Sequence, residues 1–303
     1  MRHVLIAAAA ISLSACASAP KSDAHVDAPQ TMADILAASD AAEWRRLELA
    51  STLVMTLAGD RTVVIELNPT FAPKTTANIL TMAREKYFDG LAVLRVQDNF
   101  VTQWGDPNGE SATPKPLGTA SAKVPAEFFR DRAAAPFVKL PDGDGFAWEV
   151  GFVDGFPVAR NRTAAWLAHC YGMVGAGRNN DPDSGPGSEL YVVIGHAPRQ
   201  LDRNITLVGR VVQGMEHLSA LPRGAGPLGF YEQAAQRSAI ESVRIAAELP
   251  EGGAAGKLEA LRTTSASFTA IIEARRNRRD DWYKTPAGHI DLCSVPLPVR
   301  VKS

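Results

Sequence analysis

The segment from Val63 to Asp106 decides the fold of this chain. In order, it contains VVIEL (63–67), APKTTAN (72–78), YFDG (87–90), LAVLRV (91–96) and FVTQWGDP (100–107). The β-branched and apolar runs at both ends predict strands, and Pro73 suits the first turn of a helix between them. The Asp89-Gly90 pair predicts a turn. The segment therefore predicts a strand, a helix and a strand pair in close succession.

Similar signals continue on both sides of this segment. The apolar run at 52–57 is joined by a Gly59-Asp60 turn to the strand at 61–67, which predicts a hairpin. Further strands are predicted at 172–177, 190–194, 206–211 and 240–246, and a second helix at 215–221. Many short strands with few helices predict a mainly β fold, a closed antiparallel barrel capped by two helices.

The ordered motifs resemble those of the cyclophilin family of peptidyl-prolyl cis-trans isomerases. The resemblance covers roughly residues 52–249, is interrupted by residues 110–168, and resumes at 172–177, 187–194 and 208–211. It implies a cyclophilin-like barrel and an enzyme, an isomerase that catalyses rotation about X–Pro bonds. The implied substrates are proline-containing peptide segments, and the implied chemistry needs no cofactor and no metal.

The resemblance also assigns roles to particular residues. Arg95 stands where the family's catalytic guanidinium sits, and Gln103 is expected to help hold it and the substrate carbonyl. The substrate-binding residues are expected to be Phe100, Val101, Glu189, Tyr191 and Leu201. A donor aimed at the proline nitrogen would lower a rotation barrier of about 18–20 kcal/mol. From pattern alone, the apolar members of this set could equally be ordinary barrel core.

Some positions differ from the family pattern. This chain has Leu94 and Ile205 where the family usually has His. It also has Trp104 in place of the usual small Gly, Glu189 in place of Gln, and Gln200 in place of an aromatic residue. Glu189 could pair with Arg95 and withdraw its charge from the substrate, or could orient it. These differences keep a second function open, a catalytically weak proline-segment binding or scaffold module of the cell envelope.

Residues 1–16 are typical of an export signal. A positive start at Arg2 precedes an apolar run at 4–13, which is too short to span a bilayer as a helix. LSAC, ending at Cys16, resembles a bacterial lipobox, in which that cysteine would carry lipid. Ordinary cleavage after Ala19 is the alternative. We therefore expect a periplasmic protein that acts on exported proteins and is attached to a membrane through lipidated Cys16.

Composition limits the other partners. The 303 residues include 32 Lys and Arg and 33 Asp and Glu, so the net charge is −1 and nucleic acid is not an expected partner. Asp181, Asp183 and Gly185 have a partial calcium-loop spacing but lack the distal acidic ligand. No metal site is predicted.

The remaining segments surround the predicted barrel. They are a flexible tether at 17–30, an N-terminal helical segment at 31–51, a long irregular insertion at 110–168 packed on the barrel, and a C-terminal extension at 250–303. In the extension, apolar spacing predicts a helix over about 257–281 that folds back on the barrel or its insertion.

Two cysteines remain once Cys16 carries lipid. In an oxidising compartment, the even pair Cys170 and Cys293 favours one disulfide, which would hold the extension in place. The alternative is two separately buried thiols.

Overall fold

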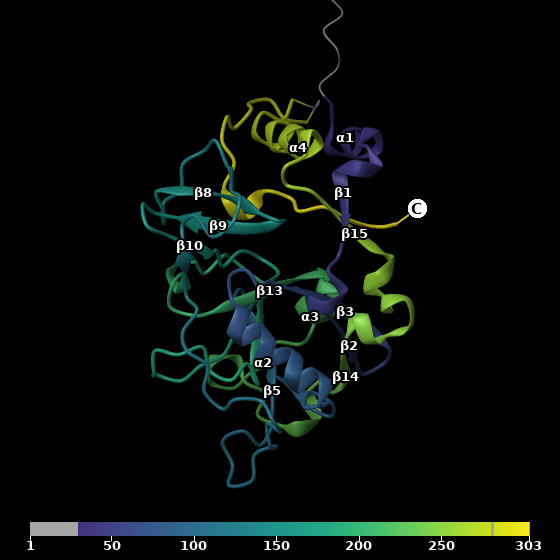
Figure 1. Ribbon diagram of the computed structural model, residues 1–303, viewed down its shortest axis with the longest axis vertical. Coiled ribbons are helices and arrows are strands. Elements are labelled where there is room, and N and C mark those ends of the chain that lie inside the picture. Colours follow the sequence, from purple (N-terminus) through teal and green to yellow (C-terminus); the bar gives the residue numbers. More distant parts are fainter. Residues whose placement is uncertain (1–29, 280–281, 303) are drawn as a thin grey trace, which may run out of the picture.

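The computed structural model describes residues 30–279 and 282–302 (Figure 1). The expected export signal at 1–16, its Cys16, and the tether up to residue 29 lie outside these described residues. Within the described part of the chain, no helix combines the length and apolar character needed to cross a membrane.

A nearly closed antiparallel barrel occupies the lower part of Figure 1. Its strands are β2 (Thr52–Leu57), β3 (Arg61–Leu67), β4 (Ala92–Val96), β5 (Val101–Gly105), β11 (Met173–Ala176), β12 (Leu190–Val193), β13 (Leu207–Gln213) and β14 (Ile240–Ile245). They form an eight-stranded sheet in the order β14-β2-β3-β13-β11-β12-β5-β4. The edges meet where Ala92 bridges Ala239 and the Val93 amide donates to the Ser238 carbonyl at 2.8 Å. The predicted barrel is confirmed.

Helices α2 (Pro73–Arg84) and α3 (Met215–Ser219) accompany the barrel, as predicted. Pro73 occupies the first turn of α2, where its missing N–H leaves no helical bond unmade. The Glu127 carboxylate accepts the backbone N–H groups of Lys74 and Thr75 at 3.0 and 2.8 Å. The helix begins where the sequence predicts, and a residue of the insertion caps it.

The insertion is not irregular as predicted, because it contains a sheet. Its strands are β6 (Arg130–Asp131), β7 (Val138–Lys139), β8 (Glu149–Val153), β9 (Phe156–Arg160) and β10 (Ala164–Leu167), in the order β6-β10-β9-β8-β7. Strands β8 and β9 are joined by Asp154 and Gly155, which both adopt positive φ. The strands are short and separated by Pro and Gly, so their alternation of apolar and polar residues is hard to detect in the sequence.

The two ends of the described chain meet in a three-stranded sheet. Its order is β1 (Trp44–Arg46), β15 (Leu258–Leu261) and β16 (Val299–Val301). The N-terminal segment also carries α1 (Met32–Ala38), and the extension carries α4 (Ala266–Arg276). Short 3₁₀ turns occur at Ala41–Glu43, Leu49–Ser51, Arg199–Leu201, Pro227–Gly229, Ala234–Gln236, Ala246–Glu248, Pro250–Gly252, Ala255–Lys257 and Leu292–Ser294.

The helix predicted over about 257–281 is wrong at its start. Leu258 and Leu261 lie in strand β15, and α4 begins only after Ser265, whose side chain accepts the Phe268 N–H. A spacing of three residues fits one face of a helix, but it does not exclude a buried strand. Pairing with β1 and β16, which lie far away in the sequence, decides for the strand.

A second core lies beside the barrel core, in the upper part of Figure 1. It combines α1, the insertion sheet and α4, and we call this cluster the second core. Phe152 of β8 meets Phe268 of α4 edge to face, with ring centroids 5.0 Å apart. A disulfide joins Cys170 to Cys293, with their Cα atoms 4.9 Å apart. The extension therefore packs largely on the insertion rather than on the barrel alone.

Two barrel strands serve both cores. In β11, Met173 belongs to the second core and Val174 to the barrel core. In β13, Leu207 belongs to the second core and Val208 to the barrel core. Because successive strand residues point to opposite faces, β11 and β13 form a wall that the two cores share.

Candidate active site

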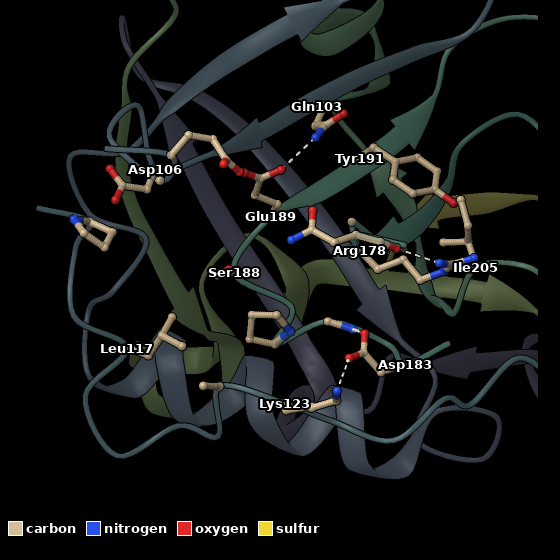
Figure 2. Close-up of a pocket in the computed structure, with 18 of the residues that line it drawn as sticks. Gln103, Asp106, Leu117, Lys123, Arg178, Asp183, Ser188, Glu189, Tyr191 and Ile205 are labelled. Carbon is tan, nitrogen blue, oxygen red and sulfur yellow. Dashed lines mark hydrogen bonds and ion pairs between the residues drawn. The ribbon is translucent and has the colours of Figure 1, made fainter. Parts of the chain in front are cut away.

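A groove of about 630 Å³ lies on the outer face of the barrel (Figure 2). It brings together residues that the sequence analysis assigned to catalysis and to substrate binding. Its lining includes Arg95, Phe100, Val101, Gln103, Glu189, Tyr191 and Leu201. Thus every residue of that set lies in one groove.

Strand register explains how three of these side chains meet. In the antiparallel pairing, Arg95 of β4 lies opposite Gln103 of β5, and Gln103 lies opposite Tyr191 of β12. The neighbours of Gln103 in β5, Thr102 and Trp104, are buried at 0% and 1% exposure. Alternation along β5 therefore sends Thr102 and Trp104 inward and Gln103 outward into the groove.

Arg95 is held by three acceptors. Its Nε donates to the Leu228 carbonyl at 2.6 Å, and its Nη1 donates to Gln103 Oε1 at 3.2 Å. Its Nη2 donates to Gln97 Oε1 in a short hydrogen bond. A guanidinium has five N–H donors, so these contacts fix its plane and leave two donors for a ligand.

Two aromatic rings flank the same guanidinium. The Arg95 Cζ atom lies 5.5 Å from the Phe100 ring centroid and 5.4 Å from that of Phe230. Burial lowers the pKa of Arg95 from its usual value. Gln97, Leu228 and Phe230 were not predicted from the sequence as neighbours of Arg95. Gln97 was detectable by its position two residues after Arg95, but the 222–230 loop has no pattern that predicts its contact with β4.

An apolar pocket lies next to Arg95. Val101 and Tyr191 line its base and form a buried cluster with Val193, against which Phe100 and Ile205 pack. Ile205, which stands where the family has a His, thus extends the apolar wall. The pocket can accept a small apolar ring, with Leu201 as a further lining residue.

A network of buried, hydrogen-bonded polar side chains supports this pocket from behind, and it was not predicted from the sequence. The Tyr191 hydroxyl lies 2.9 Å from His169 Nε2, and His169 Nδ1 lies 2.9 Å from Asp202 Oδ1. Arg199 Nε donates to Asp202 Oδ2 at 2.7 Å, and Arg199 Nη1 donates to Asp144 of the insertion at 2.9 Å. An ionised Asp202 only accepts, so His169 donates from Nδ1, and the Nε2 atom of a neutral His169 accepts a hydrogen bond from the Tyr191 hydroxyl.

Burial and neighbouring charges shift the pKa values of two members of this network, Tyr191 and Asp202. Burial raises the pKa of Tyr191, and the nearby charge of Asp202 raises it further. Burial alone would also raise the pKa of Asp202, but the hydrogen bond from His169 and the charge of Arg199 hold it below its usual range. Tyr191 therefore stays a neutral hydrogen-bond donor and serves as a wall of the pocket.

Glu189 does not pair directly with Arg95. Its Oε2 accepts a hydrogen bond from Gln103 Nε2 at 2.8 Å (Figure 2). A carboxylate only accepts, so the Gln103 amide must turn its NH₂ toward Glu189 and its oxygen toward Arg95. Of the two expectations for Glu189, the structure favours orientation, acting through Gln103.

The partial calcium-loop residues lie at another part of the groove. Lys123 Nζ is 3.1 Å from Asp181 Oδ2 and 3.6 Å from Asp183 Oδ2. A lysine therefore supplies the positive charge between them. In the described ranges, no group of three or more His, Cys, Asp or Glu side chains is arranged to hold a metal ion.

Comparison with known proteins agrees with this geometry. The family model described as cyclophilin type peptidyl-prolyl cis-trans isomerase/CLD matches residues 52–246. A probable peptidyl-prolyl cis-trans isomerase of Brucella suis is 26% identical over 182 residues, which cover 58% of this chain and 73% of the relative. A peptidyl-prolyl cis-trans isomerase-like 4 of Gibberella zeae is 30% identical over 179 residues. That match covers 56% of this chain but only 31% of the fungal protein.

A solved structure extends the likeness in fold beyond the barrel. The crystal structure of cyclophilin AquaCyp293 from Hirschia baltica matches with a TM-score of 0.66 at 23% identity. The match covers 90% of this chain and 99% of the other, so it includes regions outside residues 52–246. The fold and the family model lead to one conclusion: the chain belongs to the cyclophilin-type peptidyl-prolyl cis-trans isomerase family.

Proposed function

We propose that this chain catalyses cis-trans isomerisation of X–Pro peptide bonds and that it does so in exported proteins. The observation that carries the catalytic part is the Arg95–Gln103 pair beside an apolar pocket on the barrel surface. The names of the Brucella suis and Gibberella zeae relatives support the same activity.

The proposed mechanism needs electrostatic stabilisation but no covalent step. Rotation breaks the resonance of the X–Pro amide and leaves a lone pair on the proline nitrogen. One of the two remaining N–H donors of Arg95 would stabilise that lone pair only in the twisted state. The second N–H of the Gln103 amide, beyond the one given to Glu189, would hold the substrate carbonyl.

The pocket holds the proline ring still while the other side of the X–Pro bond rotates. Val101 and Tyr191 are 2% and 5% exposed, so they form a rigid base for a proline ring. With the ring held there, the carbonyl group of the preceding residue turns against Arg95. Phe100 and Phe230 limit water around the guanidinium, which strengthens its hydrogen bonds.

A peptide assay tests the activity. Arg95→Ala should lower kcat/KM for an X–Pro peptide by about a hundredfold or more, the effect of losing one donor that acts on the transition state. Arg84→Ala is the matched control, because Arg84 is an exposed arginine at the C-terminal end of α2 that pairs with the exposed Glu248. It should retain the wild-type rate.

The outcomes separate the two functions of the sequence analysis. A wild-type protein that binds the peptide but isomerises it no faster than buffer would favour the proline-segment binding or scaffold module. A protein that neither binds nor isomerises any X–Pro peptide would contradict both functions.

The exported location rests on residues 1–16 and on the disulfide. Disulfides persist in oxidising compartments, which include the bacterial periplasm. We expect Cys16→Ser to release the protein from the membrane fraction. An unmodified mature terminus at Pro20, found by mass spectrometry of the native protein, would contradict lipidation and favour an ordinary cleaved signal.

A further inference from the structure

The Glu189 carboxylate lies in the groove and is only partly exposed. Several partly or fully buried carboxylates elsewhere in the chain have arginine partners. Glu66 meets Arg45 and Arg210, Glu149 meets Arg132 and Arg160, and Asp202 meets Arg199. Asp106, in the same groove, accepts the backbone N–H groups of Asn108 and Lys115. Among the described residues, Glu189 forms no ion pair, and the neutral amide of Gln103 donates a hydrogen bond to it. A partly buried carboxylate without a cation is costly unless another molecule supplies one.

Glycines make room for the Glu189 side chain. A Cβ at Gly105 would lie 2.6 Å from Glu189 Cγ, and a Cβ at Gly177 would lie 3.2 Å from Glu189 Cβ. The side chain therefore crosses two backbone segments that have no side chains of their own. Its Oε1 lies toward Gly109, where a Cβ would be 3.7 Å away. The hydrogen bond from Gln103 and the close backbone segments restrict the carboxylate before any ligand arrives, which lowers the entropy lost on binding.

Nearby negative charges make the binding of a cation beside Glu189 more favourable. Glu110 and Asp106 line the same part of the groove. Burial raises the pKa of Glu189, and the charges of Glu110 and Asp106 raise it further. A positive group placed here would relieve both the burial of the carboxylate and its repulsion from its neighbours.

We propose that Glu189 binds a lysine or arginine side chain of the substrate, close in sequence to the isomerised proline. The inference rests on the proposed function. Glu189 lies immediately before β12 and two positions before the pocket residue Tyr191, so in extended backbone the two side chains emerge about 6–7 Å apart. An extended peptide advances about 3.3–3.6 Å per residue. The cationic residue is therefore expected within about two positions of the proline.

A set of peptides tests this preference. They share one X–Pro bond and carry Lys, Ala or Glu two residues before or two residues after the proline. For one of these positions, kcat/KM should follow the order Lys, Ala, Glu, with about a tenfold difference between Lys and Glu. Raising the salt concentration should reduce this ratio, because ions screen a partly exposed charge pair.

Glu189→Gln removes the charge and keeps the shape. The Lys-to-Glu ratio should then fall to about one, whatever the absolute rate of the variant. Asp181→Asn is the matched control, because it removes one negative charge from the same groove but from the Lys123 pair. It should keep the wild-type ratio.

The result that overturns the inference differs from the result that overturns the function. A wild-type ratio near one, or an unchanged ratio in Glu189→Gln, shows that Glu189 does not select a cation. If no peptide is isomerised, the proposed activity fails, and calorimetric affinities of the same Lys and Glu peptides still decide about Glu189. A preference lost in Glu110→Gln but kept in Glu189→Gln also overturns the assignment.

Discussion

The barrel and the second core are built in different ways. Consecutive barrel strands are often neighbours in the sheet, as β2 and β3 or β4 and β5 are. The second core combines three separate parts of the chain, namely the N-terminal segment, the insertion and the extension. The groove lies on the barrel. The hydrogen-bonded side chains that run from Tyr191 to Asp144 connect it to the insertion, which forms part of the second core. Local pattern therefore describes the catalytic part far better than the part that supports it.

The shared strands predict that the two cores unfold together. Residues of β11 and β13 alternate between them, so neither core can lose these strands without exposing the other. We expect one cooperative transition in denaturant. The variants below test this expectation and the division of roles between the two regions.

The largest loss of stability should come from Phe268→Ala. Phe268 is fully buried against Phe152, and removing such a ring typically costs about 3–5 kcal/mol. Chemical denaturation should show one earlier transition, while kcat/KM of the folded protein stays at the wild-type value. Thr269→Ala, on the exposed face of the same helix, is the control. Two separate transitions would contradict a shared unfolding unit.

The disulfide should have the next largest effect. Replacing Cys170 and Cys293 by Ala should lower the free energy of unfolding by about 2–4 kcal/mol. The bond closes a loop with a sequence separation of 123, so its loss frees the unfolded chain. Wild-type protein kept in reductant should match the variant in denaturant unfolding. Thiol reagents that label both cysteines in oxidised native protein would rule out the bond.

Tyr191→Phe tests the link between the two regions. Phe keeps the apolar wall of the pocket, but it leaves His169, which is 0% exposed, without a donor at Nε2. An unsatisfied buried group costs about 1–3 kcal/mol, so thermal or chemical unfolding should show a loss of that size. Tyr171→Phe, at an exposed tyrosine, should be neutral. Equal free energies of unfolding for Tyr191→Phe and Tyr171→Phe would mean that the buried hydrogen-bonded network contributes nothing to stability.

Glu189→Gln should have the smallest effect on stability, and its sign should depend on pH. Burial and the charges of Glu110 and Asp106 raise the pKa of Glu189, so the ionised form is less favourable in the folded protein. At neutral pH the variant should be more stable by about 0.5 kcal/mol or less. The gain should vanish as the pH falls below the ordinary value of 4.5. A gain that persists at low pH would show that charge is not its cause.

Much of the barrel was predictable because its signals are local. Pro73 marks where α2 begins, and the Asp89-Gly90 turn separates that helix from β4. The second core was not predictable in the same way. Leu258 and Leu261 fit a helix or a strand equally well, and only their distant partners β1 and β16 decide. The insertion strands are likewise defined by pairing rather than by their own sequence.

The candidate site shows the same difference between residues in local motifs and residues brought in from distant segments. The resemblance placed Arg95, Gln103 and Tyr191 in one groove, because these positions belong to ordered motifs. It did not identify Phe230, which reaches Arg95 from a loop without a repeating pattern. It also did not identify His169, since a single buried histidine has no spacing that reveals a partner. Contacts across distant segments depend on the tertiary fold, and local sequence does not encode them.

The pairing of β1 with β15 sets the order in which this protein can be completed. A chain made from its N-terminus exposes Trp44 long before Leu261, its partner in the sheet, has been synthesised. At about 5–20 residues per second, the delay is on the order of ten seconds or more. During that interval Cys170 has no Cys293 to bond, and the apolar side of α1 has no α4 to cover it. Maturation is therefore timed by the last part of the chain to emerge, even though the barrel strands are already present.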